Sequence, residues 1–217
     1  MGGDDFLADR DEVFLGDAEL DPADQVAGEV GAAAPAGSPD LGQLAQLLGE
    51  DGDDRHRVDA DGDGVAETRE VFLERQKQPF GMALVGDTFY VGNTDGVVAF
   101  PYTAGADRIT AEGRKLATFK PDGHWTRSLI ASADGTRIYA GVGSLSNIGD
   151  RGMEAEEGRA AIWELDVATG KARIFASGLR NAVGMAWEPT TGTLWTVVNE
   201  RDGLGDETPP DYLTSVQ

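Results

Sequence analysis

Short apolar segments separated by glycine-containing turns dominate the chain from about residue 78 onward. Three of these regions share one layout, in which two apolar segments rich in β-branched and aromatic residues flank a tight turn. The regions are residues 79–93 with a turn at Gly86-Asp87, residues 128–141 with a turn at Asp134-Gly135, and residues 183–198 with a turn at 189–192. Each one predicts a pair of antiparallel strands joined by a hairpin turn.

Further strands are predicted between these pairs, one at 96–102 and a complete hairpin over 160–177. Four short strands in each repeat of about 40–50 residues are typical of a β-propeller blade. A solenoid or a sandwich of similar hairpins is the alternative. Residues 58–217 hold about three blades, whereas closed propellers have about four to eight. We therefore expect an all-β fold, namely an incomplete fragment of a longer propeller.

Residues 1–57 have a different composition. They contain 15 acidic and 3 basic residues, a net charge of 3 − 15 = −12, whereas residues 71–217 contain 19 acidic and 14 basic residues. Leu41, Leu44, Leu47 and Leu48 have helical spacing behind Ser38-Pro39. We expect a disordered acidic leader with one short helix.

Charge and composition exclude several classes of protein. The formal net charge of −21 argues against binding to nucleic acid through a basic surface. The absence of cysteine excludes disulfides and thiolate metal sites. No apolar run is long enough for a transmembrane helix, and the first residues lack the charged and apolar regions of a signal peptide.

A twelve-residue calcium-loop motif occupies residues 59–70 and matches D-x-[DN]-x-[DN]-G-x5-E at every constrained position. The flanking helices of a paired calcium sensor are not predicted here. The motif therefore favours a single structural calcium site over a sensor, and a solvated acidic turn is the alternative. The predicted ligands are Asp59, Asp61, Asp63, the backbone carbonyl of Val65, and Glu70.

Three polar segments are candidates for chemistry, and the repeat pattern puts all three at one end of the propeller. His124 lies just before the strand that begins near Ser128, and a neutral imidazole there could accept a proton from an alcohol. Arg180 and Asn181 hold the matching place in the next repeat and offer a planar cation and an amide. Residues 199–206 follow the third hairpin and are rich in oxygen ligands.

The runs that contain these candidates resemble the pyrroloquinoline-quinone (PQQ)-dependent glucose/sorbosone dehydrogenases. The resemblance covers about residues 57–217 and is carried by Gly123-His124-Trp125-Thr126-Arg127, by 176–181 and by 198–206. The calcium loop, Gln78-Pro79-Phe80-Gly81-Met82 and residues 93–97 are similar to the sorbosone-dehydrogenase branch in particular.

The resemblance implies a six-bladed propeller that holds PQQ over its central channel, with a calcium ion and a sugar or aldose substrate beside it. It implies His124 as the catalytic base, Arg180 and Asn181 as cofactor-binding residues, and Asp202 and Gly203 as carbonyl ligands of the calcium. It also implies an external electron acceptor and a periplasmic or secreted location. The chain departs from the glucose dehydrogenases at Ser144, where an acidic residue would orient the histidine.

Two other functions stay open on the sequence alone. One is a non-catalytic, calcium-stabilised propeller that serves as a binding module. The other is a calcium-dependent propeller hydrolase such as a lactonase. Because the resemblance places further basic cofactor-binding residues in later blades, we expect this chain alone to bind the quinone weakly or not at all.

Overall fold

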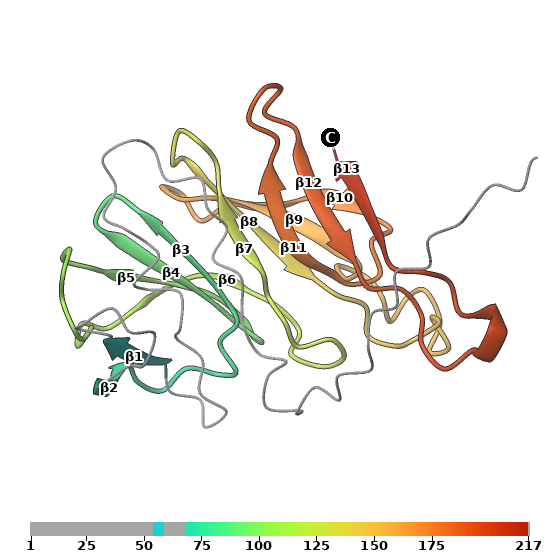
Figure 1. Ribbon diagram of the computed structural model, residues 1–217, viewed down its shortest axis with the longest axis horizontal. Helices are drawn as coiled ribbons and strands as arrows, with labels where there is room; N and C mark the ends of the chain where they lie inside the picture. Colours follow the sequence, from blue (N-terminus) through green and yellow to red (C-terminus); the bar gives the residue numbers. More distant parts are fainter. Residues whose placement is uncertain (1–53, 59–67, 217) are drawn as a thin grey trace, which may run out of the picture.

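The computed structural model describes residues 54–58 and 68–216, and these residues form antiparallel sheets (Figure 1). Blade 1 is a four-stranded meander and blade 2 repeats this order, whereas blade 3 has three strands. The strands of blade 1 are β3 (Gly81–Val85), β4 (Thr88–Asn93), β5 (Gly96–Pro101) and β6 (Arg114–Thr118). Those of blade 2 are β7 (Leu129–Ala131), β8 (Arg137–Val142), β9 (Ala161–Asp166) and β10 (Ala172–Ser177). Those of blade 3 are β11 (Ala182–Trp187), β12 (Leu194–Val198) and β13 (Tyr212–Val216), and a 3-10 turn, η3 (Gly205–Glu207), precedes β13.

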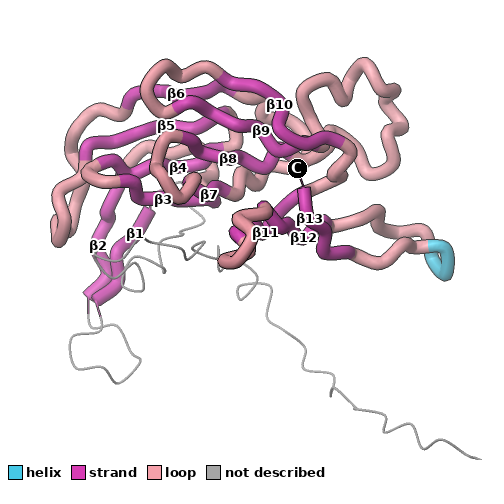
Figure 2. Tube along the Cα trace, turned by 90° about the horizontal axis from the view of Figure 1, so that it is seen from above, coloured by secondary structure: helices cyan, strands magenta, loops and turns pink. Residues whose placement is uncertain are grey.

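A separate two-stranded hairpin lies beside blade 1 (Figure 2). It consists of β1 (Asp54–Val58) and β2 (Thr68–Leu73), in which Val58 pairs with Thr68. β1 includes residue 57, at which the sequence predicted that the acidic leader would end. The rest of that predicted leader, residues 1–53, lies outside the described residues.

Apolar side chains hold neighbouring blades together face to face. Tyr90 and Val97 of blade 1 share a buried cluster with Leu129 and Ile138 of blade 2. The opposite face of blade 2 contributes Ile130 and Tyr139 to a second cluster with Leu194 and Val198 of blade 3. A third cluster joins Phe72 and Leu73 of β2 to Met82, Phe89 and Tyr102 of blade 1. The second strands of blades 1 and 2, β4 and β8, are thus buried on both faces, which explains their continuous apolar sequences. In blade 3, β12 alternates buried and exposed residues.

Glycines allow the inner strands of adjacent blades to approach closely. A Cβ atom at Gly92 of β4 would clash with the backbone oxygen of Arg127, and one at Gly141 of β8 would lie 2.5 Å from the backbone oxygen of Ala182. Because these contacts are with backbone atoms, a larger residue could not be accommodated by a rotamer change.

These observations confirm the prediction of an all-β fold built as a partial propeller of about three blades. The hairpins predicted around residues 79–93, 128–141, 160–177 and 183–198 are present. Four strands were missed, namely β1, β2, β6 and β13. β1 and β2 flank the calcium motif, and β6 and β13 are edge strands with mostly polar or exposed residues. No helix among the described residues is long and apolar enough to cross a membrane.

Candidate functional site

The blade topology brings several loops to one end of the sheets. In a meander, the residues before the first strand and those after the second strand lie at the same end. His124 precedes β7 and Ser144 follows β8, whereas Arg180 and Asn181 precede β11 and Asn199 follows β12. Hydrogen bonds from the Ser144 N–H to the Arg180 oxygen (2.7 Å) and from the Asn199 N–H to the Asn181 oxygen (3.0 Å) join these loops.

The imidazole of His124 is held by Ser144. Its Nδ1 atom lies 2.8 Å from the backbone oxygen of Ser144 and 3.2 Å from the Ser144 hydroxyl oxygen. Because a carbonyl oxygen can only accept, we assign the ring proton of the neutral imidazole to Nδ1. The Ser144 hydroxyl donates to the backbone oxygen of Ser146 at 2.7 Å, so its own oxygen can accept from Nδ1. Nε2 then carries the lone pair that can accept a proton.

Gly143 separates His124 from Asn181. A Cβ atom at Gly143 would clash with Oδ1 of Asn181 and lie 2.6 Å from Cβ of His124, so only glycine lets the two residues flank this position. Asn181 is buried, and its Oδ1 has no hydrogen-bond partner among the described residues. A buried amide oxygen without a partner is costly, which makes this atom a candidate contact for a bound ligand.

The guanidinium of Arg180 ties three loops together. It donates to the backbone oxygens of Asn147 and Asn199, both at 3.0 Å, and to Oδ1 of Asn147 at 2.7 Å. It also forms a 3.0 Å ion pair with Asp202. These contacts use four of its five N–H donors and leave one on Nη1. The loops therefore offer a proton acceptor, a cation and an amide, a set that suits a planar anionic ligand with carbonyl oxygens.

Two buried arginines support the loop that carries His124. Arg127 is fully buried and donates to the backbone oxygens of His124 (2.6 Å), Thr126 (2.8 Å) and Lys120 (3.1 Å). Arg159 donates to the oxygens of Asp122 (2.5 Å) and Lys120 (3.3 Å). Burial, with a smaller effect from the charge of Arg159, lowers the pKa of Arg127 to about 10. The side chain stays protonated at neutral pH.

The calcium motif at residues 59–70 falls mostly outside the described residues. Asp59, Asp61, Asp63 and Val65 lie outside the described residues, whereas Glu70 belongs to β2, where its backbone pairs with His56. The segment that contains the motif therefore connects two antiparallel strands.

The second predicted calcium position, at Asp202 and Gly203, lies beside Arg180. The Asp202 side chain is paired with Arg180 and its backbone oxygen accepts from Nδ2 of Asn147 at 2.8 Å. Within residues 54–58 and 68–216, no three His, Asp or Glu residues form a group that could hold a metal ion.

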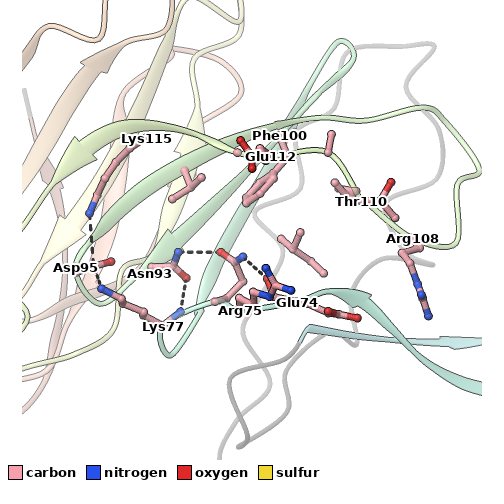
Figure 3. Close-up of a pocket in the computed structure, with 16 residues that line it drawn as sticks. Glu74, Arg75, Lys77, Asn93, Asp95, Phe100, Arg108, Thr110, Glu112 and Lys115 are labelled. Carbon is pink, nitrogen blue, oxygen red and sulfur yellow. Dashed lines mark hydrogen bonds and ion pairs between the residues drawn. The ribbon is translucent and has the colours of Figure 1, made fainter.

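A cavity of about 580 Å3 lies on blade 1 and is lined by none of His124, Arg180 or Asn181 (Figure 3). Asp95 forms ion pairs there with Lys77 at 2.7 Å and Lys115 at 3.4 Å. Partial burial raises the pKa of Asp95, but the hydrogen bond from Lys77 and the charge of Lys115 outweigh it and hold the pKa below its ordinary value. Lys77 and Lys115 thus share a single carboxylate. The lining holds four basic and three acidic residues but no histidine, so it offers no imidazole base of the kind that His124 provides.

Sequence reasoning missed Asn147, Glu156 and the two buried arginines. Asn147 and Glu156 belong to a loop without a motif, and their contacts depend on the conformation of that loop. The position of Arg127 directly before an apolar strand was the one available signal, since a charged residue there has to find partners when it is buried.

The structure resembles the Trichoderma reesei enzyme of Carbohydrate-Active Enzymes Family AA12 in its iodide and calcium structures, with TM-scores of 0.65 and 0.64, 22% identity, and coverage of 76% of this chain and 47% of that chain. It also resembles the holo form of the pyranose dehydrogenase PQQ domain from Coprinopsis cinerea, with a TM-score of 0.59, 20% identity, and coverage of 75% and 45%.

An uncharacterized protein from Borreliella burgdorferi is 28% identical over 93 residues, which cover 43% of this chain and 24% of that protein. The chain thus spans less than half the length of each of these proteins. The model of the TrAA12-like family matches residues 43–210, far more than half of the chain. The chain therefore belongs to the TrAA12-like family.

Proposed function

We propose that the protein is a quinoprotein dehydrogenase that oxidises sugar-type alcohols or aldehydes with PQQ as its cofactor. Membership of the TrAA12-like family and the fold shared with the pyranose dehydrogenase PQQ domain support the proposal. The observation that carries it is the pairing of two features across Gly143, an imidazole with its Nε2 lone pair available and a buried amide oxygen without a partner.

The residues present fit the quinone. The positive charge and remaining N–H donor of Arg180 suit its carboxylate and carbonyl oxygens, and Asn181 offers an amide beside them. When bound, PQQ supplies a two-electron acceptor for the hydride that leaves the substrate carbon. His124 takes the proton of the substrate hydroxyl at Nε2, while Ser144 holds Nδ1 and stabilises the imidazolium that forms.

Calcium belongs to the same proposal. The motif at residues 59–70 supplies a structural site between β1 and β2, with Asp59, Asp61, Asp63, Val65 and Glu70 as ligands. For the cofactor calcium, we propose the carbonyl groups of Asp202 and Gly203. In this arrangement the backbone oxygen of Asp202 would bind the ion in place of the hydrogen bond that it accepts from Asn147.

The substrate class is an aldose or a related sugar, with sorbosone-type aldehydes as the narrower candidate. This choice follows from the sequence resemblance to the sorbosone-dehydrogenase branch and from the name of the pyranose dehydrogenase neighbour. An external electron acceptor would reoxidise the cofactor, and the same resemblance favours a periplasmic or secreted location.

The test is a dye-reduction assay on the whole native protein, loaded with PQQ and calcium and supplied with aldoses. We expect turnover that falls at least about 100-fold in His124→Ala, because a positioned general base contributes about that much. Replacement of the chain's other histidine, His56→Ala, is the control and leaves the rate unchanged.

Absence of turnover in the wild type, or an unchanged rate in His124→Ala, contradicts the proposal. A quinone titration without any absorbance change would favour the non-catalytic binding module. Lactone cleavage in the absence of quinone would favour the hydrolase.

A further inference from the structure

The carboxylate of Glu156 holds the backbone next to Ser144. One of its oxygens accepts from the Leu145 N–H at 2.7 Å, and the other accepts from the N–H (3.2 Å) and the hydroxyl (3.1 Å) of Ser146. Glu156 forms no ion pair within the described part of the chain. Its negative charge is therefore stabilised by these three hydrogen bonds. Hydrogen bonds to a carboxylate are stronger than those between neutral groups.

The held segment directly follows Ser144, which supplies the two atoms that orient His124. The backbone oxygen of Ser144 accepts from both the backbone N–H of His124 (3.1 Å) and its Nδ1 (2.8 Å). The Ser144 hydroxyl is fixed by its hydrogen bond to the backbone oxygen of Ser146, one of the two residues that Glu156 binds. Movement of residues 145–146 would therefore displace the acceptor of the imidazole proton.

The contacts continue from Glu156 back to the loop before His124. The N–H of Arg159 donates to the backbone oxygen of Glu156 at 2.9 Å. The buried side chain of Arg159 then donates to the oxygens of Asp122 and Lys120, just before His124 in the chain. Glu156 is thus connected to the His124 loop in two ways, through residues 144–146 and through Arg159.

We propose that Glu156 is a positioning residue that keeps His124 in the Nδ1–H tautomer, with Nε2 as the proton acceptor. It would supply, through the backbone of residues 144–146, the orientation that a carboxylate in direct contact would give. This inference rests on the proposed function for its catalytic meaning, whereas the tautomer itself can be measured without cofactor. A fixed tautomer matters because the other one would put a proton on the atom that has to accept one.

The test uses Glu156→Gln in the whole protein with nitrogen-15-labelled histidine. Glutamine keeps the shape but replaces one acceptor oxygen by an NH2 group, which then faces an N–H donor of Leu145 or Ser146. Glu154→Gln, an exposed residue two positions away, is the matched control for the change in charge. The signals of His124 are those that disappear from the spectrum of His124→Gln. The assignment is simple because the chain has two histidines.

At a pH where the ring is neutral, the wild type and Glu154→Gln should show one tautomer with the proton on Nδ1. Glu156→Gln should show a mixture, and in the loaded enzyme kcat should fall about tenfold with an unchanged quinone affinity, corresponding to one lost hydrogen bond to a charged group. Ser144→Ala, which keeps the backbone oxygen, should retain the Nδ1–H tautomer.

A single Nδ1–H tautomer in a folded Glu156→Gln variant would overturn the inference. So would a tautomer mixture in Ser144→Ala that equals the one in Glu156→Gln, since the hydroxyl alone would then be responsible. If Glu156→Gln does not fold, the wild-type tautomer decides, and a proton on Nε2 overturns the inference. Failure of the proposed function would appear separately, as absent turnover in a wild type that has the expected tautomer.

Discussion

At the scale of single residues, Tyr139, which packs between blades 2 and 3, makes the stability of the fold depend on pH. It is buried, its ring makes edge contacts with Phe175 at 5.0 Å and Trp187 at 5.2 Å, and its hydroxyl donates to Glu164 at 3.0 Å. Burial, followed by the hydrogen bond to the Glu164 carboxylate and its charge, raises the pKa of Tyr139 to about 12. The folded protein therefore retains this proton at pH values where the unfolded chain has lost it.

Stability should fall with rising pH because of this tyrosine. Its contribution is fully present below the ordinary pKa of about 10 and is lost as the pH rises to about 12, for a total of about 2 kcal/mol. Urea unfolding at several pH values from about 9 to about 12 measures this loss of stability. Tyr139→Phe should flatten this decline relative to the wild type, and an equally steep decline in the variant would refute the assignment.

At the scale of elements, the loop before β7 depends on Gly123. This glycine has a φ of +76°, and a Cβ atom there would lie 2.6 Å from both Cα of Leu145 and the oxygen of Ser144. Gly178, in the corresponding loop before β11, has a φ of +82°, but a Cβ atom added there would meet no other atom within 4 Å. A comparison of alanine substitutions at the two glycines therefore separates the cost of backbone strain from the cost of a steric clash.

Gly178→Ala should lower the free energy of unfolding by about 1 kcal/mol, the cost of a left-handed conformation. Gly123→Ala should cost at least about 3 kcal/mol, because the clash with the Ser144 backbone adds to the same strain. Urea unfolding of both variants provides the comparison. Equal losses would mean that the close approach of the two loops does not contribute to stability.

The hairpin β1–β2 provides a test of the calcium motif between its strands. Calcium at 100 times its dissociation constant should stabilise the protein by about 2.7 kcal/mol, seen as a higher melting temperature. Glu70→Gln should abolish this increase, because it removes the predicted bidentate ligand. Glu74→Gln, just beyond β2, is the control and should retain it. A melting temperature independent of calcium in the wild type would rule out the site.

The predictability of these elements depends on how local their signals are. Hairpins such as β7–β8 could be predicted because Asp134 and Gly135 define the turn between two apolar segments. β6 could not, because it is a polar edge strand that is specified by its pairing with β5. At the site, His124 and Ser144 are neighbours through strand pairing, which sequence can indicate. Glu156 reaches residues 145 and 146 through the folded path of a loop, which sequence pattern does not encode.

At the scale of the whole molecule, the candidate site depends on blade packing. His124 and Ser144 come from blade 2, whereas Arg180 and Asn181 come from blade 3. The apolar contacts of Ile130 and Tyr139 with the strands of blade 3 set the spacing between these groups. Catalysis by such a site would therefore be a property of the assembled propeller rather than of one blade.

The central claim is that His124 accepts the substrate proton as a bound quinone is reduced. The most direct measurement is the rate at which an aldopyranose reduces PQQ bound to the whole protein in one turnover without oxygen, followed by the absorbance of the quinone. We predict rapid reduction in the wild type and a rate at least about 100-fold lower in His124→Ala, with the same quinone affinity. Reduction at the wild-type rate in His124→Ala, or no binding of PQQ to the wild type, would contradict the account.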